Sequence, residues 1–428
     1  MTTVELTRTR LDARVRRIFV GFGFSALGSG LTMPFLFVYL SEVRGISTVT
    51  VGLVFAYMGA LGFVAAPIGG SVIDRFGPRP VMLVGLVTEC LSTAAIGRVA
   101  TVPQALLVAT VMTLGSVGLW PASTAMLTRL VPVEERERVY GLQFMLLNAG
   151  LGVGGLVSAA IVDIGSVASF QRLYLIDAAS YVVYLVVLAS LPRGTGLASP
   201  PPIAGDAPVG PAAVQPGWGT VLRDRTLLRV VGLSILAVTF GYSQFETGFA
   251  AYTVDVAGVA PRFLGLAYGA NTATIVIGQL LTLRLVKGRR RSAMLATCAA
   301  IWAVSWAVIA SSDATSGAVS VVLVVIGLGV FGVGETIWAP MAPAIVNDLA
   351  PEEMRGRYNA LQGMTWTVAS IVGPAFAGLM IGGGLAHEWI ATLVVGMMVA
   401  AVLFARLRHH VTDRQDGLAV PDGAGVTD

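Results

Sequence analysis

Long apolar runs separated by short polar breaks make up most of this chain of 428 residues. Twelve of these runs are long enough to form helices that cross a hydrocarbon layer, since a layer about 30 Å thick requires about 20 apolar residues. We expect these helices at residues 18–41, 48–72, 80–100, 104–128, 139–163, 170–191, 228–253, 261–284, 292–311, 315–346, 357–382 and 386–405. The pattern therefore predicts an all-α polytopic membrane protein with twelve transmembrane helices.

The composition of the chain agrees with this class. Hydrophobic residues make up 55% of the chain and charged residues 12%, whereas a soluble globular protein carries about 25% charged residues. Both cysteines, Cys90 and Cys298, fall inside apolar runs, which argues against a disulfide framework. The sequence has no phosphate-binding loop that ends in Gly-Lys-Ser/Thr. We therefore expect no enzyme activity, no cofactor and no metal site, and an energy supply that comes from gradients.

The basic residues are distributed unevenly between the two sets of loops. If the N-terminus is cytoplasmic, 24 of the 28 lysines and arginines lie on the cytoplasmic side and four on the other side. This asymmetry fits the positive-inside rule, predicts that both termini are cytoplasmic, and explains the basic charge without nucleic acid as a partner. A single lysine, Lys287, beside 27 arginines is typical of a GC-rich bacterial genome. We therefore expect a multi-pass protein of a bacterial inner or plasma membrane.

Two segments have a composition typical of flexible chain. Residues 192–225, between the sixth and seventh predicted helices, hold seven of the twenty prolines and are predicted to be a cytoplasmic linker. Residues 409–428 are polar and are predicted to be a disordered cytoplasmic tail. The linker divides the chain into an N-terminal six-helix bundle at 1–191 and a C-terminal six-helix bundle at 226–408.

The two predicted bundles share a sequence repeat. "LVPVEERERVYGLQFMLLNAGLGVG" from Leu130 aligns without gaps on "LAPEEMRGRYNALQGMTWTVASIVG" from Leu349, at a shift of 219 residues. The same shift places Gly115 on Gly334 and Pro121 on Pro340. Two six-helix repeats of the same topology predict a parallel pseudo-two-fold axis, with a substrate site between the halves near the middle of the membrane.

The short loop after the second predicted helix contains the stretch "GGSVIDRFGPRP". Taken alone, it can be an ordinary tight turn that carries positive charge on the cytoplasmic side. Together with the repeat, the spacing of its glycines and charges closely resembles the inter-helix signature of the major facilitator superfamily, and the resemblance extends over the whole chain. The residues that carry the signature are Gly70, Asp74, Arg75, Gly77 and Arg79.

The resemblance implies a gate at the cytoplasmic end of the molecule. In that family the acid of the motif caps the start of a helix in the other half, so Asp74 is expected at the start of the helix at 357–382. Arg75 or Arg79 would bridge to the loop that contains Arg136 and Arg138. The matching loop of the second half, "RLVKGRRRSAM", has arginines but no acid at the corresponding place. We therefore expect a carboxylate latch at only one of the two loops.

Four carboxylates lie well inside predicted helices: Glu89, Asp177, Glu246 and Glu335. An acid in the membrane is costly, so each is a candidate for proton transfer or for binding a cation. In a facilitator fold, however, the helices that carry Glu89 and Asp177 lie outside the central cavity. For these two acids the alternative is structural, namely a protonated acid bonded to a neighbouring helix. For Glu246 the alternative is an acid in outward-facing water.

Glu335 combines several features of a functional residue. It lies near the middle of its helix, five residues before Pro340, and Trp338 offers an aromatic surface nearby. Its counterpart in the first repeat is Ser116, so the repeat itself requires no acid here. A structural acid that bonds backbone groups freed by the proline is the alternative. Further polar or aromatic candidates at similar depth, which can contact a ligand or bond helix to helix, are Asn148, Trp366 and Thr367.

The acids of the seventh and tenth helices look like those of proton-coupled twelve-span multidrug exporters. The fourth helix lacks the arginine that such antiporters carry, and Gly155 replaces a proline of their fifth-helix motif. The resemblance implies a monomeric secondary transporter in the lipid bilayer that exports small amphipathic or drug-like compounds in exchange for protons. A proton-coupled importer of a small nutrient is the alternative. A sensor or membrane anchor is disfavoured, because we find no domain outside the membrane.

Overall fold

A computed structural model of the chain describes residues 11–163, 165–192, 194–195, 217–246, 248–260 and 263–418. Every regular element in these residues is a helix. Eleven of these helices are long and apolar enough to cross a membrane, and the number is twelve if the bent pair Ala13–Thr32 and Leu36–Val43 counts as one span. The predicted all-α class with twelve spans is confirmed.

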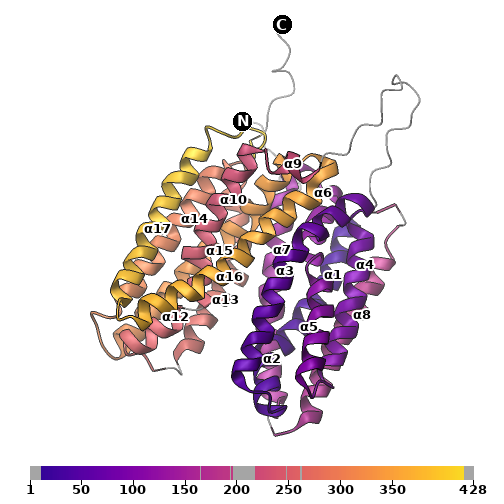
Figure 1. The fold of residues 1–428 in the computed structure, drawn as a ribbon. Coiled ribbons are helices and arrows are strands. Elements are labelled where there is room, and N and C mark those ends of the chain that lie inside the picture. Colours follow the sequence, from indigo (N-terminus) through magenta and orange to yellow (C-terminus); the bar gives the residue numbers. More distant parts are fainter. Residues whose placement is uncertain are drawn as a thin grey trace, which may run out of the picture.

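The first half of the chain forms one bundle (Figure 1). It has six spans when the bent pair is counted as one. Its first span bends by 44° between Ala13–Thr32 and Leu36–Val43. The helices of this half are α1 (Ala13–Thr32), α2 (Leu36–Val38), α3 (Thr48–Phe76), α4 (Pro78–Ile96), α5 (Val102–Ser116), α6 (Leu119–Leu130), α7 (Val133–Ile161) and α8 (Val167–Ala189). Helices α5 and α6 together form the predicted fourth span, which is interrupted at Val117 and Gly118.

The second half forms the other bundle. Its seventh span, predicted as one helix, contains π-helical turns at Val238–Tyr242 and Tyr252–Val256. The helices of this half are α9 (Trp218–Val221), α10 (Arg225–Ala237), α11 (Ser243–Glu246), α12 (Gly248–Ala251), α13 (Leu264–Val286), α14 (Arg291–Ala310), α15 (Ala318–Leu349), α16 (Arg355–Gly382) and α17 (Ala386–Leu407). Most of the predicted linker lies outside the described residues.

Glycines in α1 and α7 let these two helices pack closely within the first bundle. A Cβ on Gly154 would lie 2.8 Å from the Cα of Gly30, and a Cβ on Gly150 would lie 2.6 Å from the Cβ of Ala26. Because lipid tails are as apolar as leucine, helices in a membrane gain little from burying apolar side chains and associate through close packing instead. The small residues of α7 therefore fix the position of α1 at the centre of the bundle.

The two bundles approach each other at one end and separate toward the other. They are close where α6, α9 and α10 lie and far apart where α2 and α12 lie (Figure 1). At the near end, which we call the closed end, α3 packs against α16, and α7 packs against α13 and α15. Gly70 of α3 lets the halves approach closely there, since a Cβ on it would lie 2.7 Å from the Cβ of Ala360. The opposite end is called the open end.

The predicted disorder of the tail 409–428 does not hold for its first part. Residues 409–418 form turns, and the Asp416 carboxylate accepts hydrogen bonds from the backbone N–H and the hydroxyl of Ser292 at 2.7 and 2.8 Å. A polar composition predicts disorder because such a segment buries little apolar surface. Here the segment is held by arginines and helix-terminal N–H groups of α14 instead. Residues 419–428 lie outside the described part.

Candidate functional site

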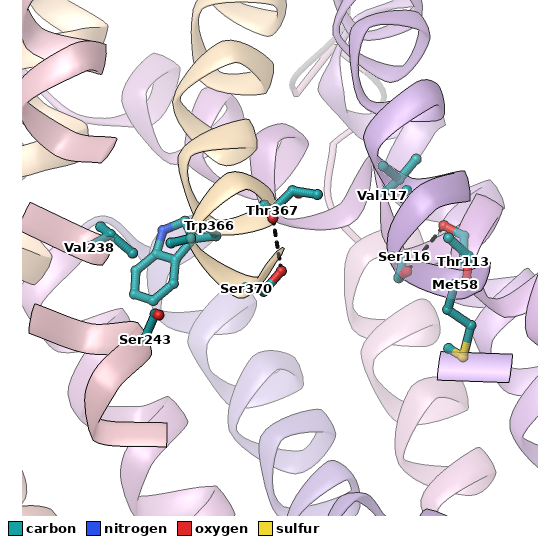
Figure 2. A pocket seen from close by; sticks show the side chains of 12 residues that line it. Met58, Thr113, Ser116, Val117, Val238, Ser243, Trp366, Thr367 and Ser370 are labelled. Atoms are coloured by element: carbon teal, nitrogen blue, oxygen red, sulfur yellow. Dashed lines mark hydrogen bonds between the residues drawn. The ribbon is translucent and has the colours of Figure 1, made fainter. Parts of the chain in front are cut away.

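A cleft of about 450 Å³ lies between the two bundles. Helices α3, α5 and α16 and the seventh span contribute its walls, and Figure 2 shows Thr367 and Ser370 on one side facing Thr113, Ser116 and Met58 on the other. The described residues that line it are hydroxyl, aliphatic, thioether or aromatic, and none of them is ionisable: Met58, Gly59, Gly62, Thr113, Ser116, Val117, Val238, Ser243, Trp366, Thr367, Ala369 and Ser370. The volume lies within the usual range for small-molecule sites.

Two of the residues predicted for a ligand site line this cleft. The indole of Trp366 is 39% exposed and packs edge-on against Tyr242, with ring centroids 4.6 Å apart. Thr367 accepts a hydrogen bond at its backbone oxygen from the Ser370 hydroxyl at 2.9 Å. Asn148, predicted at similar depth, does not line the cleft. Its side-chain amide donates to the Phe144 carbonyl of its own helix at 3.0 Å.

Glu335 lies inside the second bundle, behind the wall of the cleft. Its side chain is 2% exposed, and its Oε2 accepts a hydrogen bond from the side-chain amide of Asn271 on α13. The glycines of "FGVGET" make room for the neighbouring helices. A Cβ on Gly332 would lie 2.9 Å from the Asn271 carbonyl oxygen of α13, and one on Gly334 would overlap the Trp302 indole of α14. The carboxylate is thus buried between helices, where the side-chain amide of Asn271 donates to it.

Trp338, predicted to offer an aromatic surface for a ligand, does not line the cleft. Trp338 is 5% exposed and packs against Trp302 of α14 and Phe404 of α17, at centroid distances of 5.6 and 6.1 Å. It therefore points toward the outer helices of the bundle. Trp338 is three residues beyond Glu335, and the hydrophobic pattern of α15 does not reveal which face meets the cleft, because the helix is apolar on all sides.

A chain of aromatic rings connects the cleft with the region around Glu335. Tyr242 contacts both Trp366, in the cleft, and Phe331, at 5.9 Å. Phe331 stacks on Trp302 at 4.9 Å, and the Trp302 indole donates to the Phe331 carbonyl at 3.0 Å. Phe331 lies one helical turn before Glu335 on α15. Direct ring contacts therefore join the cleft to α15.

The other acids predicted inside the membrane are placed as follows. Asp177 on α8 accepts a hydrogen bond from the Thr32 hydroxyl of α1 at 2.5 Å and from the Ser180 hydroxyl at 3.3 Å. Glu89 on α4 is 4% exposed, and its Oε1 has no hydrogen-bond partner within the described part of the chain. Neither side chain lines the cleft. The side chain of Glu246 lies outside the described residues.

At the closed end, Asp74 lies where the resemblance to the major facilitator superfamily implies. Its carboxylate accepts hydrogen bonds from the backbone N–H groups of Gly356 and Arg357, at 2.5 and 3.2 Å, at the start of α16. The Arg357 guanidinium lies 3.4 Å from the same carboxylate. A carboxylate at a helix N-terminus is stabilised by unpaired N–H groups and by the helix dipole. This contact joins the two halves.

The arginines of the same motif do not make the predicted bridge to the loop at 134–138. Arg79 is buried and donates to the carbonyls of Ala189, Leu191 and Pro192 at 3.0, 2.8 and 2.6 Å, so it caps the end of α8 within its own half. Arg75 lies over the ring of Phe76, 5.3 Å from its centroid. Gly77, with a φ of 83°, ends α3 in a conformation that glycine adopts without strain.

A second set of charges joins the halves at the closed end. Arg136 of α7 forms an ion pair with Asp348 of α15, while Arg138 pairs with Glu135 of its own helix at 3.1 Å. Asp348 also pairs with Arg291 of α14, and Arg291 donates to Glu137 of α7 at 2.8 Å. Sequence reasoning did not single out Asp348, Arg291 or Glu137. The only available signal was the excess of charge in the loops of this end.

Comparison with known proteins identifies relatives over nearly the whole chain. The family model described as Major Facilitator Superfamily matches residues 18–339 and 323–421. The chain is 25% identical over 366 residues to the "uncharacterized MFS-type transporter YqjV" of Bacillus subtilis (strain 168), covering 85% of each protein. It is 23% identical over 243 residues to the quinolone resistance protein NorA of Staphylococcus aureus (strain Mu50 / ATCC 700699), covering 56% of this chain and 58% of NorA.

Solved structures share the arrangement of the helices. A bacterial homologue of the iron transporter ferroportin in an outward-facing state superimposes with a TM-score of 0.77 at 15% identity, covering 92% of this chain and 99% of that one. The Escherichia coli fucose:proton symporter FucP superimposes with a TM-score of 0.70 at 16% identity, covering 91% and 98%. At these identities the likeness concerns the fold.

Proposed function

Because the chain belongs to the major facilitator superfamily, we propose that it is a proton-driven exporter of small amphipathic compounds. Members of this family are secondary transporters and not enzymes, and the chain is one of them. The direction of transport, the class of cargo and the coupling to protons are the parts that we propose. The observation that carries the proposal is an uncharged, partly aromatic cleft with a buried carboxylate behind its wall.

The lining of the cleft supports an amphipathic cargo. Trp366 and Met58 offer apolar and polarisable surfaces, and the hydroxyls of Ser116 and Ser370 offer hydrogen-bond partners. A compound with a large fixed charge would leave water without meeting an opposite charge on this lining, which is costly. Compounds with an apolar body and few polar groups lose the least hydration free energy when they enter the cleft. The relative NorA, named for quinolone resistance, is consistent with this class of cargo.

Glu335 is the proposed proton carrier. A buried carboxylate costs several kcal/mol unless it is paired or protonated, and acids inside membrane proteins mark ion and proton pathways. The Asn271 amide can donate to the ionised carboxylate and to the carbonyl oxygen of the protonated acid, so this contact survives both states. A charged Glu335 therefore favours an arrangement in which water or a cationic cargo reaches it. A neutral Glu335 favours the packed arrangement.

The ring contacts between the cleft and α15 provide a physical route for coupling. A cargo that occupies the cleft displaces Trp366, and Tyr242 passes this displacement to Phe331 one turn before the acid. Binding of cargo and binding of a proton at Glu335 are then alternatives that favour different packings of the same helices. Exchange of one for the other across the membrane is antiport.

The proton gradient supplies enough free energy for this work. Moving one charge through a membrane potential of 100 mV provides about 2.3 kcal/mol. At about 1.4 kcal/mol for each factor of ten, this sustains a roughly 40-fold concentration gradient of a neutral cargo for each proton. A difference in pH adds to this value. Export against a moderate gradient therefore requires no nucleotide.

The orientation of the protein in the membrane follows from its charges. The excess of arginines lies in the loops of the closed end, so we propose that this end and both termini face the cytoplasm of a bacterium. The cleft then opens outward, and a cargo in it is about to leave the cell. We expect the transporter to act as a monomer, since each chain carries both halves of the cleft.

The test uses the purified protein in liposomes with imposed pH gradients and neutral, cationic and anionic fluorescent compounds. An antiporter accumulates its cargo when the interior is acidic, whereas a symporter, such as a nutrient importer, accumulates it when the exterior is acidic. We expect accumulation of neutral and weakly cationic compounds with an acidic interior, above the level in protein-free liposomes, and its loss when an ionophore collapses the gradient. Accumulation only with an acidic exterior would establish import instead.

A further inference from the structure

The loop between α13 and α14 lacks the acid that the first half uses to join the bundles. Gly77 and Gly288, with φ of 83° and 71°, are the turn glycines of the two loops, and aligning them places Asp74 on Leu285, an apolar residue near the end of α13. The loop contributes a buried arginine instead, since the side chain of Arg291 is 1% exposed. A buried guanidinium requires partners for its N–H groups. The identity of these partners reveals what the second loop does.

The partners of Arg291 come from both halves of the molecule. Its Nε donates to Glu137 of α7 in the first half at 2.8 Å, and one of its Nη atoms donates to Asp348 of α15. The same Nη atom donates to the backbone oxygen of Gln415 in the tail at 3.1 Å. The second loop thus forms a latch with reversed charges: the arginine is in the loop, and the acid is in the opposite half.

The tail supplies the acid that the second loop lacks. Asp416 is fully buried, and its carboxylate accepts from the N–H and hydroxyl of Ser292 in the first turn of α14, while its backbone oxygen accepts from the Arg291 N–H at 2.8 Å. A carboxylate in this place caps the helix and favours its dipole. The next residue, Gly417, lies so close to the latch that a Cβ on it would be 3.0 Å from the Arg291 Nε and 3.2 Å from a Glu137 oxygen.

We propose that the C-terminal segment 412–418 is a brace for this second latch, in which Asp416 positions Arg291 for its ion pair with Glu137 of the opposite half. An arginine side chain loses much rotational freedom when it is fixed, and a partner that fixes it in advance lowers the cost of the next contact. The brace contacts α14 in the second half, so it can remain docked while the halves rock. The brace stabilises the arrangement in which the two bundles are in contact at the closed end.

The brace acts on the equilibrium between the open and closed arrangements of the closed end. Its effect does not depend on the cargo or on proton coupling. Glu137 moves away with the first half when the closed end opens, and Arg291 then loses one of its partners. Without the brace, Arg291 is less well ordered for recapturing Glu137, so the closed end opens more often. Because no cargo is needed to observe this, a failure of the proposed function and a failure of the brace give separate results.

The test measures distances between spin labels on the full-length, cysteine-free protein in lipid nanodiscs without cargo. One label pair, at Glu42 and Asp255, spans the open end, and another, at Glu134 and Arg289, spans the closed end. For Asp416→Asn we expect the ratio of closed to open populations at the closed end to fall by about tenfold, which is less than the full value of a buried bond to a charged group, because Asp416 acts on the bond to Glu137 only through Arg291. An unchanged ratio would overturn the proposal.

The same segment offers a matched control. Asp413 forms an ion pair with Arg290 at 2.8 Å, but its side chain is 61% exposed. Exposed pairs contribute little, so Asp413→Asn should change the ratio by less than about threefold although it removes the same charge. An equal effect of both substitutions would mean that the tail acts through its overall charge, and this would contradict the role of Asp416 as a positioning residue.

A double-mutant cycle separates positioning from a general loss of stability. If Asp416 acts through Arg291 and Glu137, the effect of Asp416→Asn disappears in a Glu137→Gln background. The same shift in both backgrounds would overturn the inference. Ser292→Ala removes one bond to Asp416 and keeps its charge, so it should produce a smaller shift in the same direction. This milder variant provides the test if Asp416→Asn does not fold, and no shift in it would then count against the brace.

Discussion

The contact between Asp74 and the start of α16 allows the strength of the first latch to be worked out. Replacing Asp74 with asparagine keeps the shape of the side chain and removes its charge. The carboxylate accepts two backbone N–H bonds at 2.5 and 3.2 Å, and its side chain is 5% exposed, so solvent screens these interactions little. The asparagine retains one acceptor oxygen and turns an NH₂ group toward the second N–H. The variant therefore loses one charge-assisted bond and the interaction with the helix dipole.

The expected size of this loss follows from typical values. A hydrogen bond to a charged group contributes about 1.5–3 kcal/mol, and a charge at a helix terminus contributes about 0.3–1 kcal/mol. We therefore expect Asp74→Asn to weaken the closed end by about 2–4 kcal/mol, which is a roughly 30- to 700-fold change in the ratio of closed to open populations. The label pair at Glu134 and Arg289 measures this ratio directly.

A matched control tests whether the effect belongs to the contact between the halves. Asp12 also lies at a helix start, where it accepts the Arg14 N–H at 2.7 Å, but all of its contacts are within the first half. Asp12→Asn should lower thermal stability slightly and leave the distance distribution unchanged. If Asp74→Asn gives the wild-type distribution, or if Asp12→Asn gives the same shift, the reasoning from the contact between halves is refuted.

Three further substitutions test other parts of the account. Gly70→Leu places a side chain against Ala360, so the closed end should fail to close, and the label distances there should increase. Trp366→Ala removes the ring that contacts Tyr242 in the cleft, so the cargo concentration for half-maximal transport should rise about tenfold, as expected for the loss of an aromatic contact and its buried area. Arg79→Gln removes bonds within one half, so the temperature of unfolding should fall while the ratio of open to closed populations stays unchanged.

The sequence predicted the number and class of the helices because a membrane span requires a long apolar run, whatever its neighbours are. It did not predict the interruptions of the fourth and seventh spans. The break at Val117 and Gly118 has a signal that the hydropathy pattern passes over, since Pro121 lacks the N–H that would bond to the Val117 carbonyl. The π-helical turns of the seventh span have no such signal. Local backbone changes of this kind depend on packing against other helices.

The candidate site was predicted only in part, because hydropathy does not show which side of a helix faces the cleft. Trp366 and Thr367 line the cleft, whereas Trp338, on an equally apolar helix, packs against outer helices. Asn271 was missed, although an amide within a predicted span is itself a signal for a buried polar contact. The docking of Asp416 was not predictable, since it depends on where the folded chain places the start of α14.

The most direct test of the proton-carrier role is accumulation by Glu335→Gln in liposomes with an acidic interior, compared with wild type and Glu89→Gln. The account predicts that Glu335→Gln still lets cargo equilibrate down its own gradient but accumulates none against it, while Glu89→Gln, which makes the same chemical change away from the cleft, accumulates cargo. Accumulation by Glu335→Gln at the wild-type level would contradict the central claim.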